Sequence, residues 1–150
     1  MEKGARTLSV EVIGVDLKPP ASKGFGVPIL RANAVRDQLP NADVAFSMHL
    51  GHHLSEIDLI GLIHNVGRFC RRFILLDLVR HPAPLALFRL FVAPFVCRIV
   101  VVDGARSIRR SYTTAELRRL TNIALAGSGS VFRQSVTPFY THQIIDIAYA

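Results

Sequence analysis

The stretch that decides the fold is residues 41–81, NADVAFSMHLGHHLSEIDLIGLIHNVGRFCRRFILLDLVRH. An apolar run over 42–48 leads into a polar turn over 49–55, then a helical pattern, then a second apolar run over 73–79. A continuous apolar run of this kind is typical of a parallel strand buried on both faces. The order therefore predicts a strand, a crossover helix and a second strand parallel to the first.

The helical pattern begins after Ser55. Ser55 and Asp58 have the spacing of a capping box, in which each side chain accepts a hydrogen bond from the other residue's backbone amide. We expect a helix over 56–70. Its apolar residues recur at three- and four-residue spacing, and arginines in its last turn suit the helix dipole. The apolar face comprises Ile60, Ile63, Val66 and Cys70.

The polar turn over 49–55 falls at the carboxyl end of the first predicted strand. Open α/β sheets bind their ligands at this end of the strands. The sequence therefore predicts that a site, if the protein has one, lies at this turn, which contains three histidines: His49, His52 and His53.

Length and composition favour one globular domain over residues 1–150. A chain of 150 residues with 50% hydrophobic residues is long enough to bury a sizeable core. Cys70 and Cys97 lack the spacing of a disulfide framework or a zinc site, which fits a reducing cytoplasm. The first residues lack the apolar core of a signal peptide, so we expect a cytoplasmic protein.

The chain is basic, with a net charge of +7, which raises nucleic acid or an anionic membrane as partners. No zinc finger and no aromatic-studded basic strand accompanies the charge, so a solvated basic face is favoured over nucleic-acid binding. The apolar stretch over 83–102 is interrupted by Arg89 and Arg98 and kinked by Pro94, which argues against a membrane span. We expect a helix capping the sheet end. An interfacial membrane helix, with both arginines reaching the interface, remains the alternative.

The chain before residue 41 contains a predicted strand over 10–17. An acid near the end of such a strand, here Asp16, can accept hydrogen bonds from both ribose hydroxyls of a nucleotide-like cofactor, although it can equally form a turn. Residues 27–32 are predicted to form an edge strand, because Pro28 excludes a central one. Asn33 and Ala34 follow. The Asn33 amide can bind a purine edge or make an ordinary Asx turn.

The chain after residue 102 begins with a turn predicted at Asp103-Gly104. A second capping box, from Thr113 to Glu116, then predicts a helix over 114–126 that ends at a glycine. Two strands follow, over 130–138 and 142–150. Their link is too short for a parallel crossover, so they should form an antiparallel pair.

The order of these parts resembles that of class I S-adenosylmethionine-dependent methyltransferases of the small-molecule type. The resemblance covers residues 10–150 and rests on these segments: VIGVDL at 12–17, Asn33-Ala34, NADVAFS at 41–47 with HHL at 52–54, FILLDLV at 73–79, and SIRRSYTTAEL at 107–117. It implies an α/β fold with a Rossmann-like, mostly parallel sheet that ends in a C-terminal antiparallel pair. It also implies S-adenosylmethionine as cofactor and a small molecule as substrate.

The resemblance also assigns roles to individual residues. Asp16 would bind the cofactor ribose, and Asn33 with Ala34 would meet the adenine. Ser47 would line the methyl-transfer site, together with the turn that follows it. A hydroxyl or amine acceptor needs a base, and histidine suits that task near neutral pH, which suggests His53 or His49.

Two alternatives for the histidines remain open. They can be exposed turn residues or hydrogen-bonding groups at a helix start. They can also form a metal site with His64, but that cluster lacks a carboxylate or a thiolate, so we predict no metal.

The family begins with a strand, a glycine-rich turn and a helix that hold the cofactor, and this sequence has no such segment. The missing strand would leave a gap of roughly 9.6 Å, two strand spacings, beside the strand at 42–48. We therefore expect an amino-terminally truncated methyltransferase domain that binds cofactor poorly. A homodimer or a separate amino-terminal fragment would fill the gap. The alternative is a non-catalytic partner or scaffold that retains the fold.

Overall fold

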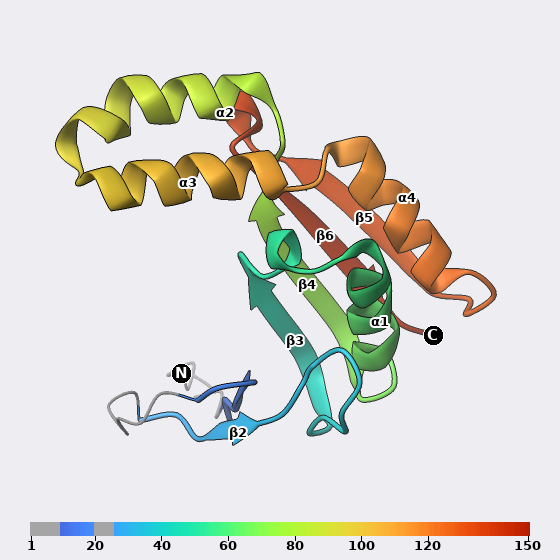
Figure 1. The fold of residues 1–150 in the computed structure, drawn as a ribbon. Helices are drawn as coiled ribbons and strands as arrows, with labels where there is room; N and C mark the ends of the chain where they lie inside the picture. Colours follow the sequence, from blue (N-terminus) through green and yellow to red (C-terminus); the bar gives the residue numbers. More distant parts are fainter. Residues whose placement is uncertain (1–9, 20–25) are drawn as a thin grey trace, which may run out of the picture.

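The computed structural model describes residues 10–19 and 26–150. Its main feature is a four-stranded sheet in the order β3 (Ala42–Met48), β4 (Cys70–Leu78), β6 (His142–Ala148) and β5 (Val131–Val136) (Figure 1). β3 is parallel to β4, whereas β6 is antiparallel to both of its neighbours. The parallel pair and the C-terminal antiparallel pair are as predicted.

The crossover between β3 and β4 is α1 (Glu56–Val66). Ser55 accepts a hydrogen bond from the Asp58 amide at 3.1 Å, but the Asp58 carboxylate accepts from the Ser55 hydroxyl at 2.7 Å, so only half of the predicted capping box forms. The predicted end of the helix was wrong. α1 stops at Val66, and Cys70 is the first residue of β4, where it pairs with Ala42.

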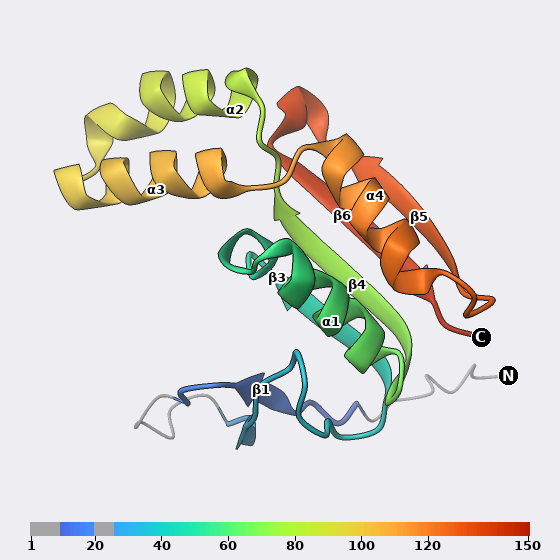
Figure 2. The same ribbon diagram turned by 45° about the vertical axis from the view of Figure 1, so that its right-hand side comes forward.

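The second helix on the sheet is α4 (Thr114–Leu125), and its capping box is complete. Thr113 accepts from the Glu116 amide at 3.2 Å, and Glu116 accepts from the Thr113 amide at 2.9 Å. α1 and α4 lie side by side on one face of the sheet (Figures 1 and 2), where Arg119 pairs with Glu56 at 2.8 Å. The core forms between these helices and the sheet. Its fully buried side chains include Leu59, Leu62, Ile63, Leu117, Leu120, Phe73, Leu75, Ile145 and Ile147.

The opposite face of the sheet is apolar and exposed at β3. The parallel register places Phe46 beside Ile74 and Met48 beside Leu76. Phe46 is 61% exposed and Met48 is 59% exposed. We call the side chains of Val44, Phe46 and Met48, with Ile74 and Leu76 beside them, the open face.

A second, two-stranded sheet is formed by β1 (Gly14–Asp16) and β2 (Ile29–Arg31), which are parallel. β1 is shorter than the predicted strand over 10–17. No ladder joins this sheet to β3 within the described residues. In both ribbon views the small sheet lies near the end of β3 where that strand begins (Figures 1 and 2). The strand predicted over 10–17 was expected in the main sheet, but β1 pairs only with β2, and the described residues place no strand between β1 and β3.

Residues 82–110 form a helical hairpin that projects from the sheet (Figure 1). Its first arm is α2 (Pro82–Leu87), extended by a π-helical turn η2 (Phe88–Val92) and a short η3 (Ala93–Phe95); its second arm is α3 (Arg98–Arg110). The predicted turn at Asp103-Gly104 was wrong, because both residues lie inside α3. Gly104 packs against the Phe88 ring, which a Cβ at that position would overlap, so this glycine permits close approach of the two arms.

Candidate active site

The histidine turn lies at the carboxyl ends of β3 and β4 and contains a short helix, η1 (Gly51–His53). His49 has a φ of 56°, and its amide donates to the Leu76 carbonyl at 2.9 Å. A Cβ at Gly51 would overlap the Asp77 carboxylate. The turn therefore wraps closely around the end of β4, and the side chain that it encloses is Asp77.

Asp77 and His52 form a buried pair. The Asp77 Oδ2 atom accepts from the His52 backbone amide at 2.7 Å, and Oδ1 lies 2.6 Å from His52 Nδ1. Oδ1 also accepts from the Leu78 amide at 2.8 Å. Because an ionised carboxylate only accepts hydrogen bonds, the proton of neutral His52 resides on Nδ1, which leaves Nε2 as the proton acceptor. The pair thus fixes both the orientation and the tautomer of His52.

A cavity of about 360 Å³ separates the histidine turn from the helical hairpin. The hairpin side of the cavity is mostly apolar, so the hairpin provides a wall of the site. The lining residues are His49, His52, His53 and Leu78 on the sheet side, and Phe88, Gly104, Ser107 and Ile108 on the hairpin side. An apolar wall opposite a cluster of imidazoles suits a largely apolar ligand with one ionisable hydroxyl or amine.

His142, at the start of β6, belongs to the same cluster and was missed in the sequence. Its ring stacks on His49, with centroids 5.2 Å apart and planes 21° from parallel. Burial and the nearby charge of His49 hold the pKa of His142 below its usual 6.5, although Asp77 acts in the opposite direction. The antiparallel pairing of β6 with β4 determines where His142 lies. His142 is the first residue of β6 and pairs with Leu78, the last residue of β4.

Of the residues predicted to bind the cofactor, Asp16 ends β1, Asn33 and Ala34 follow β2, and Ser47 lies in β3. Asp16 is exposed and accepts from the Lys18 amide at 2.6 Å, and the Asn33 oxygen accepts from the Val35 amide at 3.0 Å. The Ala34 carbonyl accepts from Asn65, near the end of α1. The histidine turn precedes the other end of that helix, whose 11 residues extend over roughly 16 Å.

These residues suit S-adenosylmethionine only in part. Asp16 keeps a carboxylate oxygen exposed to solvent, which fits ribose hydroxyls. Because the Asn33 oxygen is already engaged, its amide nitrogen suits a ring nitrogen of adenine better than the amino group. Ser47 is half-buried near the end of β3. None of the four predicted residues lines the histidine cavity, so their roles stay predictions.

No cluster of three or more histidine, cysteine or acidic side chains is arranged to hold a metal ion in the described part of the chain. His64, the fourth member of the alternative metal set, is exposed on α1.

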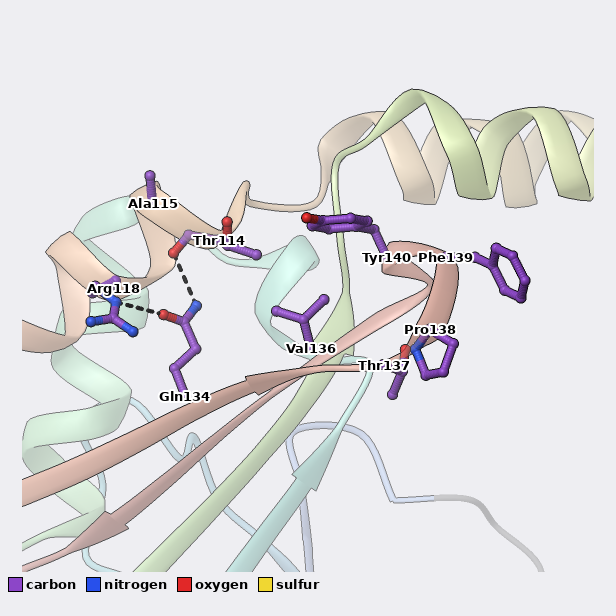
Figure 3. Close-up of a pocket in the computed structure, with 9 residues that line it drawn as sticks. All are labelled: Thr114, Ala115, Arg118, Gln134, Val136, Thr137, Pro138, Phe139 and Tyr140. Carbon is purple, nitrogen blue, oxygen red and sulfur yellow. Dashed lines mark hydrogen bonds between the residues drawn. The ribbon is translucent and has the colours of Figure 1, made fainter.

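A second cavity, of about 620 Å³, lies between the start of α4 and the end of the β5–β6 hairpin (Figure 3). The Gln134 side chain lines this cavity. Its amide oxygen accepts a hydrogen bond from Arg118 at 3.0 Å, and its amide nitrogen donates one to the Thr114 carbonyl at 2.9 Å. Phe139 and Tyr140 both have positive φ, and the Tyr140 ring points toward the start of α4 while the Phe139 ring points away. No residue predicted from the sequence lies here, so the histidine cavity is the candidate active site.

No protein-family model matches the sequence, and no curated protein matches it. Solved structures do match the fold. The plantazolicin methyltransferase BpumL, in complex with a monoazolic desmethylPZN analog and SAH, superposes with a TM-score of 0.73 at 8% identity, over 93% of this chain and 66% of that one. The fold is that of the class I methyltransferases.

Two further methyltransferase structures support this assignment. The plantazolicin methyltransferase BamL gives a TM-score of 0.72 at 13% identity, over 96% of this chain and 70% of that one. Human N-acetylserotonin methyltransferase, in complex with SAM, gives 0.55 at 11% identity, over 87% of this chain and 36% of that one. This chain thus has a methyltransferase fold but is shorter than each of these proteins.

Proposed function

We propose that this chain takes part in S-adenosylmethionine-dependent methyl transfer to a small molecule. The observation that carries the proposal is the histidine cavity at the carboxyl ends of β3 and β4, where a class I methyltransferase sheet binds its ligands. The apolar hairpin wall would hold the body of the acceptor. The imidazoles would face its reactive oxygen or nitrogen.

His52 is the best-placed base in this cavity. When bound, the cofactor supplies an activated sulfonium methyl group. The acceptor oxygen or nitrogen would bond to that methyl as the sulfur–methyl bond breaks and the cofactor leaves as S-adenosylhomocysteine. The proton that the acceptor loses would go to the Nε2 atom of His52. Asp77 stabilises the imidazolium that results, as a buried carboxylate does for a catalytic histidine. His53 and His49, suggested by the sequence, line the same cavity and are proposed as auxiliary proton acceptors.

The cofactor would be held by residues from both sheets. We propose that Asp16 binds the ribose, that Asn33 and Ala34 contact the adenine, and that Ser47 lies near the methyl group. The described residues contribute no glycine-rich turn for the rest of the cofactor. We therefore expect weak binding by this chain alone.

A strand that the described residues do not supply would complete the site. We propose that a second copy of the chain or a separate amino-terminal fragment places it between β1 and β3. The separation of the two sheets and the exposure of the open face support this.

Cys70 and Cys97 are free thiols, which supports a cytoplasmic location.

A non-catalytic partner or scaffold is the second candidate. It is favoured by the lack of a glycine-rich turn in the described residues, because a binding protein could keep the fold without keeping the cofactor. The affinity of the chain for S-adenosylhomocysteine, the product formed from the cofactor, distinguishes the enzyme from the scaffold.

Titration of the ¹⁵N-labelled chain with S-adenosylhomocysteine, followed by NMR, tests the cofactor site. We expect weak binding, with shifts at the amides of Asp16, Asn33 and Ser47, and loss of those shifts in Asp16→Ala. No shift up to millimolar ligand would favour the scaffold. Micromolar binding would show that the missing turn is dispensable.

Transfer of a tritiated methyl group to a panel of phenols and amines, at millimolar cofactor, tests the reaction. Replacing a general base lowers rates roughly 10²–10⁴-fold. We expect His52→Ala to lower the rate by at least the smaller factor. His64→Ala is the matched control, because His64 is an exposed histidine outside the cavity. Equal effects of the two variants would exclude His52 as the base.

A further inference from the structure

The far end of the helical hairpin projects away from the rest of the molecule. In both ribbon views residues 89–102, which we call the hairpin tip, lie apart from the sheet and from α1 and α4 (Figures 1 and 2). The tip is strongly apolar at its surface: Phe95 is 84% exposed and Ile99 is 80% exposed. Its other exposed apolar side chains are Leu90, Phe91, Val92, Val100 and Val102.

These side chains are not needed to hold the hairpin together. The two arms pack through Gly104 against the Phe88 ring, and Ala105 and Ile108 are the buried residues of α3. All three α3 residues follow Ile99 toward the end of α3 that leads into α4. The exposed aromatic and aliphatic groups of the tip are therefore an outward surface, which calls for a partner.

The hairpin also accounts for more than half of the net positive charge of the chain. Residues 82–110 include five arginines and one acid, Asp103, for a net charge of 5 − 1 = +4 out of +7 in the whole sequence. Arg106 follows Ile99 by seven residues, which is roughly 10 Å along a helix axis. Amphipathic segments bury their apolar side chains about 5–10 Å deep at the boundary of lipid headgroups and acyl chains. The spacing thus matches an inserted tip with arginines at headgroup level.

We infer that the hairpin tip docks onto an anionic lipid bilayer. Phe91, Phe95 and Ile99 would enter the acyl boundary, while the arginines of α3 contact lipid phosphates. Arg89 and Arg98, within the tip, can extend their head groups to the interface. A convex, projecting tip with apolar groups on both arms suits a fluid surface better than a rigid protein pocket. No helix in the described residues is long and apolar enough to cross a membrane, so the attachment is peripheral. It does not depend on the proposed methyl transfer.

Co-sedimentation of the full chain with vesicles tests this inference. We expect at least tenfold tighter binding to 3:1 phosphatidylcholine–phosphatidylglycerol vesicles than to phosphatidylcholine alone at low salt. High salt should remove the difference, because exposed charges are screened. Phe95→Glu should weaken binding at least tenfold. Ile57→Glu is the matched control, since Ile57 is 82% exposed but lies on α1, and it should bind like the unmodified chain.

A second variant tests the role of charge. Arg106→Glu with Arg109→Glu should abolish the preference for phosphatidylglycerol. Absence of vesicle binding by the unmodified chain, or equal binding by Phe95→Glu, would overturn the inference. So would a concentration-dependent dimer that Phe95→Glu converts to monomer without any vesicle binding, since the tip would then contact a second copy. Circular dichroism of each variant verifies that the fold is kept.

Discussion

The two faces of β3 and β4 differ sharply in burial. Phe73 on β4 points toward α1 and α4 and is 1% exposed, whereas Phe46 on the neighbouring strand belongs to the open face and is 61% exposed. Parallel strands in α/β proteins are normally covered on both faces. One face of these strands is therefore covered by helices within the described residues, while the other face keeps the apolar side chains of a surface that is normally covered.

The largest expected effect comes from truncating these two phenylalanines. Phe73→Ala should lower the free energy of unfolding by about 3–5 kcal/mol, because it opens a cavity in a buried core. In the monomer, Phe46→Ala should change it by no more than about 0.5 kcal/mol, as at an ordinary exposed site. Guanidinium chloride unfolding, followed by circular dichroism, measures both.

The same pair of variants tests what covers the open face in solution. If a second copy packs there, Phe46→Ala will cost more, and the unfolding midpoint will rise with protein concentration. Light scattering over a concentration series then gives the assembly state directly. A monomer with full hydrogen-exchange protection of residues 42–48 would contradict the proposed association.

The next largest effect concerns Asp77, the charged group on the covered face. Asp77→Asn removes the charge that accepts from His52 and Leu78, and hydrogen bonds to charged groups contribute about 1.5–3 kcal/mol. We expect a loss of that size in unfolding free energy. NMR should also show that His52 loses its fixed tautomer. Asp58→Asn, at an exposed position, is the control, and an equal loss there would argue against a special role for the buried pair.

The elements that local pattern predicted are those that local physics determines. The apolar run of β3 predicts a strand, and the capping residues Ser55 and Thr113 predict two helix starts. None of these predictions needs a tertiary contact. Gly104 shows the limit. The pair Asp103-Gly104 has the sequence pattern of a turn. The glycine instead lies within α3, because the Phe88 ring of the other arm packs against it and leaves no room for a Cβ atom.

The position of the histidine turn was predicted, but its hydrogen-bond partners were not. The histidine turn was located correctly at the strand ends, yet Asp77, the partner of His52, was treated as part of an apolar strand. A single acid in a buried strand was the available signal, because an ionised carboxylate is rarely buried without hydrogen-bond donors. His142 could not be found locally, since its contact with His49 depends on the order of strands in the sheet.

A smaller effect is expected from the two helix caps on the covered face. Thr113→Ala removes a complete capping box and should cost about 1 kcal/mol. Ser55→Ala removes an incomplete one and should cost less, because Asp58 does not bind the Ser55 backbone amide. Thermal unfolding of the two variants measures the difference. A larger loss in Ser55→Ala would show that the half-formed box carries more stability than its contacts imply.

The smallest effect is a pH dependence at the edge of the open face, where His142 stacks on His49. Folding lowers the pKa of His142, through burial first and then the charge of His49, so below pH 6.5 the unfolded chain binds the proton more readily. Stability should therefore be fully present above pH 6.5 and fall as the pH drops toward the lower folded pKa. His142→Gln should reduce this slope between pH 7.5 and 5.5, measured by denaturant unfolding at each pH. His64→Gln should leave it unchanged, because that exposed histidine lies outside the cluster. If both variants show the same pH dependence of stability as the unmodified chain, His142 has the same pKa in the folded and unfolded states, and the prediction is wrong.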